Sequence, residues 1–267
     1  MAVSTPDHFH AIIASLAMRQ GKHVYVQKPL AQTIHEARYL RDMAMATGLV
    51  TQMGNQGGAA DGLRRAVECI QAGIIGQVKE VHVWTNRPIR AQGMDRPKGS
   101  HPVPDSLDWD FWLGPAPERP YIGNGAYCPF QWRGWQDFGT GALGDMACHT
   151  VHMPFRALGL GNPTEIEGQS LSMMNRKSYP SGSKIRFQFP SRKFAVAGKS
   201  LALDPVTLWW YDGGKAVPGA HHDGSNMPPA ELTADIVALY KNHTEVDIYM
   251  PAPGLALSAG GRSKVLI

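Results

Sequence analysis

The sequence predicts an α/β domain with a parallel sheet, followed by an α+β domain built on a large, mainly antiparallel open sheet. Helix and strand signals alternate through the first 55 residues, the rhythm changes from residue 57, and several alternating strand patterns begin at residue 164. We therefore expect two domains, at residues 1–56 and 57–267. A chain of 267 residues, 43% of them hydrophobic, is long enough to bury the cores that two domains need.

Residues 1–56 show a repeated alternation of helix and strand. Thr5 and Pro6 fit the N-cap and first position of a helix. Thr33 and Glu36 have the spacing of a capping box, and Gly48 fits the end of the helix that this box begins. Strands joined through helices are parallel. The expected elements are a helix from Thr5 to Gly21, a strand His23–Gln27, a helix Thr33–Thr47 and a strand Leu49–Met53.

Residues 57–267 are expected to form the second domain. Residues 86–131 are rich in proline, glycine and aromatic residues, and a loop of that length is either functional or contains elements that the pattern hides. No element is placed with the pattern after residue 213. The expected elements are helices Asp61–Ala72 and Gly141–Leu158 and strands Val78–Thr85, Thr164–Met174, Lys184–Phe189, Lys193–Ala197 and Val206–Tyr211.

Composition excludes several classes of protein. The net charge is only +4 and the basic residues are scattered, so we expect no nucleic-acid partner. No apolar run approaches the roughly 18 residues of a membrane span, so we expect no membrane partner. The three cysteines form no C-x-x-C pair, which favours free thiols and a reducing, cytoplasmic location.

The stretch "GKHVYVQKPLA" places a lysine, Lys28, at the tip of a short buried strand. The carboxyl ends of parallel strands form the ligand crevice of an open α/β sheet, and helix N-termini there offer N–H groups to polar ligands. A lysine shielded from water in that crevice can relay a proton or polarise a substrate oxygen. The alternative is an ordinary solvated lysine in a turn, which is the commoner situation.

A second cluster lies in the helix expected over residues 141–158. Asp145, His149 and His152 are spaced four and three residues apart, so they share one helix face. A carboxylate beside a histidine can fix its tautomer and make it a tunable base. Two alternatives remain open: a structural His–Asp pair, and a metal site, which lacks an obvious fourth ligand.

A third cluster is aromatic and lies between residues 109 and 135. Aromatic faces beside an arginine are a common sugar-binding surface, because sugar C–H faces stack on rings while donors reach the hydroxyls. The alternative is that the rings pack the irregular loop. The members are Trp109, Trp112, Tyr121, Tyr127, Trp132, Arg133 and Trp135.

Several motifs in this order resemble the Gfo/Idh/MocA family over residues 1 to about 224. The resemblance implies an NAD(P)-dependent oxidoreductase that acts on a sugar, an inositol or a related polyol, with NAD or NADP as cofactor. It also implies a partial Rossmann-type domain before the α+β domain. The motifs are "STPDHFHA" (4–11), "GKHVYVQKPLA" (21–31), "VTQMGNQG" (50–57), "FWLGPAPERPY" (111–121), "WRGWQDFGTGALGDMACH" (132–149) and "PFRALGL" (154–160).

The resemblance also implies roles for individual residues. Lys28 matches the lysine of the family's E-K-P motif and would hold the substrate oxygen. His149 would take the hydroxyl proton while hydride leaves the same carbon for the nicotinamide, and Asp145 would orient His149 or a neighbouring hydroxyl. No metal is implied. Cofactor contacts are expected from Ser4, Thr5, Pro6, His10, Gln27, Lys28 and Asn55, and substrate contacts from Trp132, Arg133 and Tyr121.

Some positions depart from the family pattern. Gln27 replaces the usual Glu, and His152 stands where an Asp is common. No G-x-G-x-x-G follows an initial strand, so the pyrophosphate loop is missing. Separately, residues 231–267 do not match the family pattern. We therefore expect a chain truncated at both ends, absent or altered final strands, and NAD affinity in about the millimolar range or weaker.

Two other functions fit the same residues. An NAD-dependent glycosidase of the family would oxidise, eliminate and re-reduce its substrate with no net NADH. A non-catalytic remnant that binds or oligomerises is favoured by the missing glycine fingerprint. The family resemblance also implies a homo-oligomer formed through the second-domain sheet, and export to the periplasm if an upstream twin-arginine signal precedes the chain.

Overall fold

The computed structural model describes residues 1–89, 92–172, 174–196, 198–217, 222–234, 254–259 and 263–266. The chain packs into two compact units. The first comprises Met1–Asn55, Pro88–Cys148 and Met173–Pro180, and the second comprises Gln56–Arg87, His149–Ser172 and Ser181–Ile267. The boundary between domains 1–56 and 57–267 stays a prediction. Among the described residues, no helix is long and apolar enough to cross a membrane.

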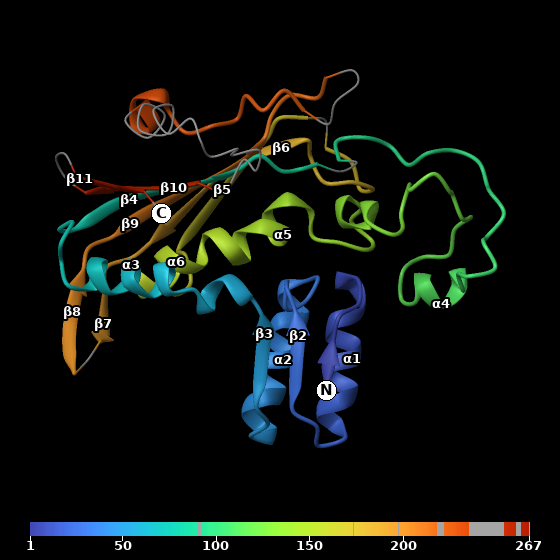
Figure 1. Cartoon of the computed structure of the whole chain (residues 1–267), viewed down its shortest axis with the longest axis horizontal. Helices are drawn as coiled ribbons and strands as arrows, with labels where there is room; N and C mark the ends of the chain where they lie inside the picture. The colour runs from blue at the N-terminus through green and yellow to red at the C-terminus, as the bar shows by residue number, and fades with distance from the viewer. Residues whose placement is uncertain are drawn as a thin grey trace. The chain divides into compact units, whose positions relative to one another are not determined.

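The first unit begins with a parallel sheet of three strands, as the β-α-β rhythm predicts. Its strand order is β1-β2-β3, and both pairs are parallel, with Val26 opposite Val3 on one side and Met53 on the other. The carboxyl ends of all three strands therefore lie at one edge. The elements are β1 (Ala2–Val3), α1 (Asp7–Arg19), β2 (Val24–Gln27), α2 (Ile34–Thr47) and β3 (Thr51–Gly54) (Figure 1).

The predicted N-cap is confirmed for α2 and is wrong for α1. Thr33 accepts a hydrogen bond from the Glu36 backbone and Glu36 returns one, so the predicted capping box of α2 is confirmed. The predicted N-cap at Thr5 is wrong. Pro6, in an extended conformation with ψ of 155°, is the N-cap of α1, and no side chain caps that helix. Helix α1 therefore begins with the acidic residue Asp7.

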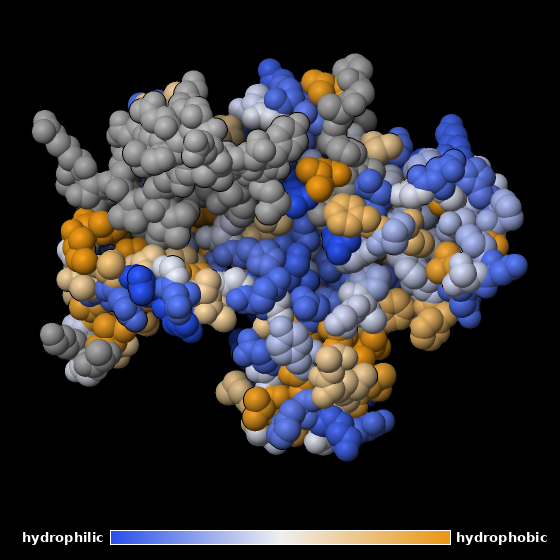
Figure 2. Space-filling view, viewed as in Figure 1, coloured by the Kyte–Doolittle hydropathy of each residue, from blue (hydrophilic) through white to orange (hydrophobic). Residues whose placement is uncertain are grey.

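The sheet of the first unit has a small core and an exposed apolar surface. Its buried residues are Val3, Ala11, Ala14, Ala17, Met18, Val24, Val26 and Leu40. Several large apolar side chains of residues 1–55 remain in contact with solvent. They include Ile12, Leu16, Ile34, Met45 and Val50. Figure 2 shows orange patches beside blue ones on this part of the surface.

The irregular stretch of the first unit is held by aromatic packing. It contains α4 (Trp109–Leu113), whose N-cap Asp108 accepts from the Phe111 backbone, and the short 3-10 helix η2 (Gln131–Gly134). Both pack around a core of Leu113, Ile122, Tyr127, Trp132, Trp135 and Phe138. The long loop predicted over 86–131 is therefore a folded layer that leads into α5 (Gly141–Thr150).

The second unit is built on a six-stranded sheet with the order β11-β10-β4-β9-β6-β5. Every neighbouring pair is antiparallel except β4 and β9, so the mainly antiparallel sheet that the sequence predicts is confirmed. The strands are β4 (Val78–Thr85), β5 (Glu165–Ser170), β6 (Gly182–Phe189), β9 (Val206–Gly213), β10 (Gly254–Ala259) and β11 (Ser263–Leu266) (Figure 1).

Three predictions for residues 141–267 need correction. The helix expected over Gly141–Leu158 is two helices, α5 and α6 (His152–Ala157), because Pro154 has no N–H to continue the hydrogen-bond ladder. Strand β8 (Lys199–Leu203), which pairs with β7 (Arg192–Val196), is not among the predicted elements. The expectation that the final strands are absent is wrong for β10 and β11, which extend the sheet from β4.

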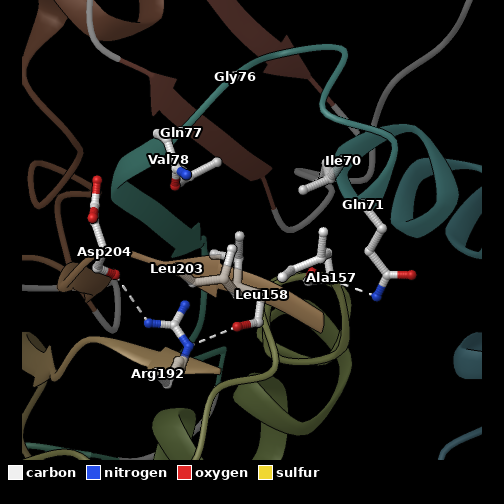
Figure 3. Close-up of a pocket in the computed structure, with 11 residues that line it drawn as sticks. Ile70, Gln71, Gly76, Gln77, Val78, Ala157, Leu158, Arg192, Leu203 and Asp204 are labelled. Atoms are coloured by element: carbon white, nitrogen blue, oxygen red, sulfur yellow. Dashed lines mark hydrogen bonds between the residues drawn. The ribbon is translucent and has the colours of Figure 1, made fainter. Parts of the chain in front are cut away.

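Helices α3 (Asp61–Gln71) and α6 meet strands β4, β7 and β8 around a small cavity of about 30 Å³ (Figure 3). Arg192 points into it and donates hydrogen bonds to the carbonyl oxygens of Leu158 at 2.7 Å and Asp204 at 3.2 Å. A space of that size holds about one water molecule. The cavity is thus a packing feature of the second unit.

Candidate active site

The candidate site of the first unit is centred on Lys28, directly after the last residue of β2. The Lys28 Nζ donates hydrogen bonds to the Asp145 carboxylate Oδ1 at 2.6 Å and to the Asp145 carbonyl oxygen at 3.0 Å. The side chains of Lys28 and Asp145 are 21% and 7% exposed. A largely buried, charge-assisted pair of this kind is unlike a solvated turn lysine. The strand tip therefore delivers the lysine to a carboxylate of α5.

Arg133 is the second cation beside Asp145, with its Nε 3.7 Å from Oδ1. Its guanidinium also stacks over the Trp132 ring at 4.2 Å and the Phe130 ring at 4.7 Å. Stacking fixes the plane of the guanidinium and leaves its edges for hydrogen bonding. Arg133 and Trp132, both predicted to contact substrate, are thus brought to the Lys28–Asp145 pair or directly beside it.

Tyr121, the third residue predicted to contact substrate, lies elsewhere in the aromatic layer. It packs edge-on against Trp109 with ring centroids 5.2 Å apart. Trp109 in turn stacks on Trp112 and Tyr127. For these residues the structure agrees with the alternative that the rings pack the irregular loop.

Asp7 is a residue of this cluster that sequence reasoning missed. It is 4% exposed, and its Oδ2 accepts a hydrogen bond from the Thr140 hydroxyl at 2.9 Å. Burial raises the pKa of Asp7 from 3.8 to about 7, with a smaller raising contribution from the Asp145 charge. The available signal was an acidic residue at the start of the helix that follows β1, which also fits an ordinary first turn of a helix.

Cys148 lies beside Asp145, and Asn55 binds Cys148. Burial raises the pKa of the Cys148 thiol to about 11, so this thiol stays protonated near neutral pH. Its Sγ lies 3.5 Å from the Asp145 carbonyl oxygen. The Asn55 side chain, just beyond β3, donates to the Cys148 carbonyl oxygen at 2.5 Å. Asn55 therefore connects the end of β3 to α5.

The strand ends of the parallel sheet carry the residues predicted to contact the cofactor. His10 is buried, and its two ring nitrogens lie 2.7 Å from the Pro29 carbonyl oxygen and 2.8 Å from that of Thr5. It thus ties together the loops that follow β1 and β2. The Thr5 hydroxyl oxygen is buried and has no hydrogen-bond partner among the described residues. A buried orphan of this kind at a strand end fits a polar ligand atom.

Residues Gly139–Gly144 read G-x-G-x-x-G and precede α5, yet the space beside their backbone is filled by the chain itself. A Cβ at Gly139 would lie 2.5 Å from the Arg133 backbone, and one at Gly141 would lie 2.5 Å from the Tyr179 ring. These glycines allow close internal packing. We therefore assign them no phosphate-binding role.

His149 and His152 occupy different helices. His149 is in the last turn of α5, one turn beyond Asp145, and it belongs to the second compact unit. Its membership of the Lys28 site stays a prediction. His152 begins α6, and its ring lies against Gly58, where a Cβ would come within 2.3 Å. Burial lowers the pKa of His152. Among the described residues, no group of three possible ligands is placed to hold a metal ion.

Two models of one oxidoreductase family, whose members have a nucleotide-binding domain, match this chain. Residues 1–55 match the model of the oxidoreductase family, NAD-binding Rossmann fold, and residues 84–164 match the oxidoreductase family, C-terminal alpha/beta domain. The chain belongs to the Gfo/Idh/MocA family. The resemblance drawn from the motifs is thus confirmed.

Individual relatives agree with this assignment. The chain is 31% identical over 102 residues to a 1-carboxy-3-chloro-3,4-dihydroxycyclohexa-1,5-diene dehydrogenase of Comamonas testosteroni. This match covers 36% of this chain and 26% of the relative. It is 26% identical over 151 residues to levoglucosan dehydrogenase of Pseudarthrobacter phenanthrenivorans, covering 57% of this chain and 30% of the relative.

A solved levoglucosan dehydrogenase in complex with NADH and levoglucosan has a similar fold. The TM-score is 0.57 at 16% identity, and the match covers 100% of this chain and 53% of that structure. The chain therefore spans about half the length of that solved relative.

Proposed function

We propose that this chain forms part of an NAD(P)-dependent oxidoreductase that transfers a hydride between a sugar or polyol carbinol and a nicotinamide. The observation that carries the proposal is the buried pair of Lys28 and Asp145 at the carboxyl edge of the parallel sheet. The solved relative holds NADH and levoglucosan, which supports this cofactor and substrate class.

The residues of the chain fit the nicotinamide end of the cofactor. Ser4, Thr5 and Pro6 follow β1, Gln27 ends β2 and Asn55 follows β3, so all five lie at the ligand edge of the sheet. The unpartnered Thr5 hydroxyl oxygen is the structural evidence for a polar ligand there. When bound, the nicotinamide supplies the hydride acceptor.

Lys28 and its partners would hold the reacting oxygen. An ammonium anchored by Asp145 keeps one N–H donor for a substrate hydroxyl, because Lys has three donors and Asp145 accepts from two of them. Arg133 adds a guanidinium with several donors beside the same carboxylate. We assign His149 the removal of the hydroxyl proton. The burial of Asp145 strengthens its attraction to both cations and keeps them in place.

The test is nicotinamide-linked turnover of a panel of sugars and inositols with millimolar NAD or NADP. Lys28→Ala should reduce kcat by about 100-fold or more, the scale of a positioned proton-transfer group. Lys22→Ala, an exposed lysine just before the same strand, is the matched control and should retain turnover. Equal turnover in both variants, or no turnover with any substrate, would overturn the proposal.

The same assay separates the two enzyme types that these residues fit. A dehydrogenase accumulates NADH in proportion to oxidised sugar. A glycosidase that oxidises and re-reduces its substrate releases sugar from a glycoside with no net NADH. We propose the dehydrogenase, because levoglucosan dehydrogenase and the Comamonas relative are both named as dehydrogenases.

We also propose that the protein is a homo-oligomer. Strand β5 is an edge of the six-stranded sheet, and its Ile166 side chain is 60% exposed. An exposed edge strand is a ready template for pairing with another chain. Light scattering at micromolar concentration should give a mass of a dimer or larger, and a clean monomer would contradict this.

A cytoplasmic location is proposed from the cysteines. Cys69, Cys128 and Cys148 are free thiols in the structure, and Cys69 is exposed. A reducing compartment preserves an exposed thiol. Cell fractionation should find the protein in the cytoplasmic fraction, and recovery from the periplasm would contradict this.

A further inference from the structure

Asp7 is a buried carboxyl group for which the proposed reaction has so far no role. It is the first residue of α1, and only 4% of it is exposed. Its one hydrogen bond from the described residues comes from the Thr140 hydroxyl, at 2.9 Å. Thr140 directly precedes α5, the helix that carries Asp145. The Asp7 carboxyl group is therefore fixed against the start of α5, the helix whose Asp145 binds Lys28.

The groups that act on Asp7 come from several elements. Lys28 after β2 and Arg133 of η2 attract its charge, and Asp145 of α5 repels it. Burial raises the pKa of Cys148 in α5 to about 11 and that of Tyr179 to about 12. The Asp7 charge contributes to raising both pKa values. Both of these groups are therefore neutral near pH 7.

The net charge of Asp7, Asp145, Lys28 and Arg133 depends on whether Asp7 is ionised. With Asp7 ionised, Asp7 and Asp145 match Lys28 and Arg133, so the net charge of these four groups is zero. With Asp7 protonated, the same groups carry a net charge of about one positive unit. The protonation of one residue outside the hydrogen-bonded pair thus changes the electrostatic potential at Lys28 and Asp145.

We propose that Asp7 is a positioning residue that acts through the Lys28–Asp145 pair and sets how readily the site accepts the proton of the substrate hydroxyl. Oxidation of a carbinol leaves a proton in the site. A site of zero net charge takes up that proton more easily than a positive one. Ionised Asp7 therefore favours oxidation. The pKa of Asp7, about 7, places this change within the neutral range.

The first arm of the test needs no substrate. The side-chain carboxyl of Asp7 is followed by ¹³C NMR in the intact chain across a pH titration, and its midpoint should lie near 7. Lys28→Met should raise the midpoint, because Lys28 lowers the pKa of Asp7. Thr140→Val removes the hydroxyl that also lowers it and should raise the midpoint too, whereas Thr140→Ser keeps the hydroxyl and is the matched control. A midpoint near 3.8, or one that Lys28→Met leaves unmoved, overturns the inference.

The second arm uses turnover and rests on the proposed function. In the unmodified chain, kcat/KM for oxidation should rise several-fold between about pH 6 and about pH 8 as Asp7 ionises. Asp7→Asn is neutral at every pH and should lose that rise, while Thr140→Val should move it to higher pH. A rise of the same size and midpoint in Asp7→Asn overturns the inference. Absence of all turnover refutes the proposed function instead, and the NMR arm still decides the coupling.

Discussion

Two lysines, one directly after a strand and one within a strand, have different partners. Lys28 follows the end of β2, and its Nζ is held by a buried carboxylate. Lys184 lies within β6, and its Nζ lies over the Trp209 ring at 4.9 Å and the Tyr211 ring at 5.5 Å. Within a strand, neighbouring strands limit a side chain to contacts on one face. At a strand end, residues from a loop and a second helix can meet it. The strand end is thus where a lysine meets a buried carboxylate from another element.

The buried titratable groups of the two regions differ in the same way. On the six-stranded sheet, burial lowers the pKa of His82 and raises that of Tyr211 to about 12. Both shifts favour the neutral forms, in which the His82 Nδ1 and the Tyr211 hydroxyl lie 3.1 Å apart. At the strand end, burial brings the pKa of Asp7 to about 7. The same physical effect keeps both groups neutral near pH 7 in one region and gives a group that titrates near pH 7 in the other.

The largest expected effect tests this difference through the pH dependence of stability. The pKa of Asp7 is raised on folding, so the folded state binds a proton between about pH 4 and pH 7 that the unfolded state releases. Stability from this group is therefore complete below pH 3.8 and is lost as the pH rises to about 7. Relative to Asp7→Asn, the free energy of unfolding should fall by up to about 4 kcal/mol across this window.

Denaturant unfolding of both proteins at several pH values measures this change. His82 has the opposite sign: its pKa is lowered on folding, so its contribution is complete above 6.5 and is lost as the pH falls. A free energy of unfolding that rises with pH below 6.5 equally in both proteins would show that His82, and not Asp7, dominates.

The second effect concerns the two histidines after Asp145. His149→Ala should cut kcat by about 100-fold, as loss of a proton-transfer group does, and His152→Ala should have a mild effect. The mild effect is expected because His152, at the start of α6, packs its ring against Gly58. Steady-state kinetics of the two variants gives the comparison. Equal losses together with inhibition by chelators would instead indicate a metal site.

The third effect tests whether Gly139–Gly144 serves packing. Gly141 has a φ of +64°, and a Cβ there would lie 2.5 Å from the Tyr179 ring. Gly141→Ala should therefore lower the free energy of unfolding by about 2 kcal/mol, from backbone strain and overpacking. Gly57→Ala is the control, because a Cβ there meets nothing within 4 Å. Equal stability of the two variants in urea unfolding would contradict the packing role.

The smallest effect belongs to the lysine within the sheet. Lys184→Met keeps the aliphatic stem over the rings and removes only the charge. The expected loss is about 0.5–1 kcal/mol, the scale of an exposed to partly buried cation–π contact, with no change in turnover. A loss of turnover as large as that of Lys28→Ala would remove the contrast between the two lysines.

Local chemistry in the sequence was sufficient for several elements. The capping box of Thr33 and Glu36 placed the start of α2, Gly48 placed its end, and alternation placed β4 at Val78–Thr85. The Lys28–Pro29 motif and the Asp145 spacing also pointed to the site through their family resemblance. Such signals work because a cap, a turn or an amphipathic strand depends on residues close in the chain.

Other features were set by contacts between distant residues. Strands β10 and β11 lie far along the chain from β4, yet they extend its sheet, and no local pattern reveals such a pairing. Tyr121 and Lys184 each have an ordinary sequence context, and their neighbours decided that one packs a loop and the other a sheet face.

The sequence by itself determined the family, the parallel sheet and the position of Lys28 at a strand tip. Only the tertiary structure decided that Asp7 belongs to the same cluster, 133 residues before its partner Thr140. The reason is physical. The pKa of a carboxyl group depends on how much water surrounds it and which charges face it, and both are fixed only when the loops after β1 and β2 pack against α5.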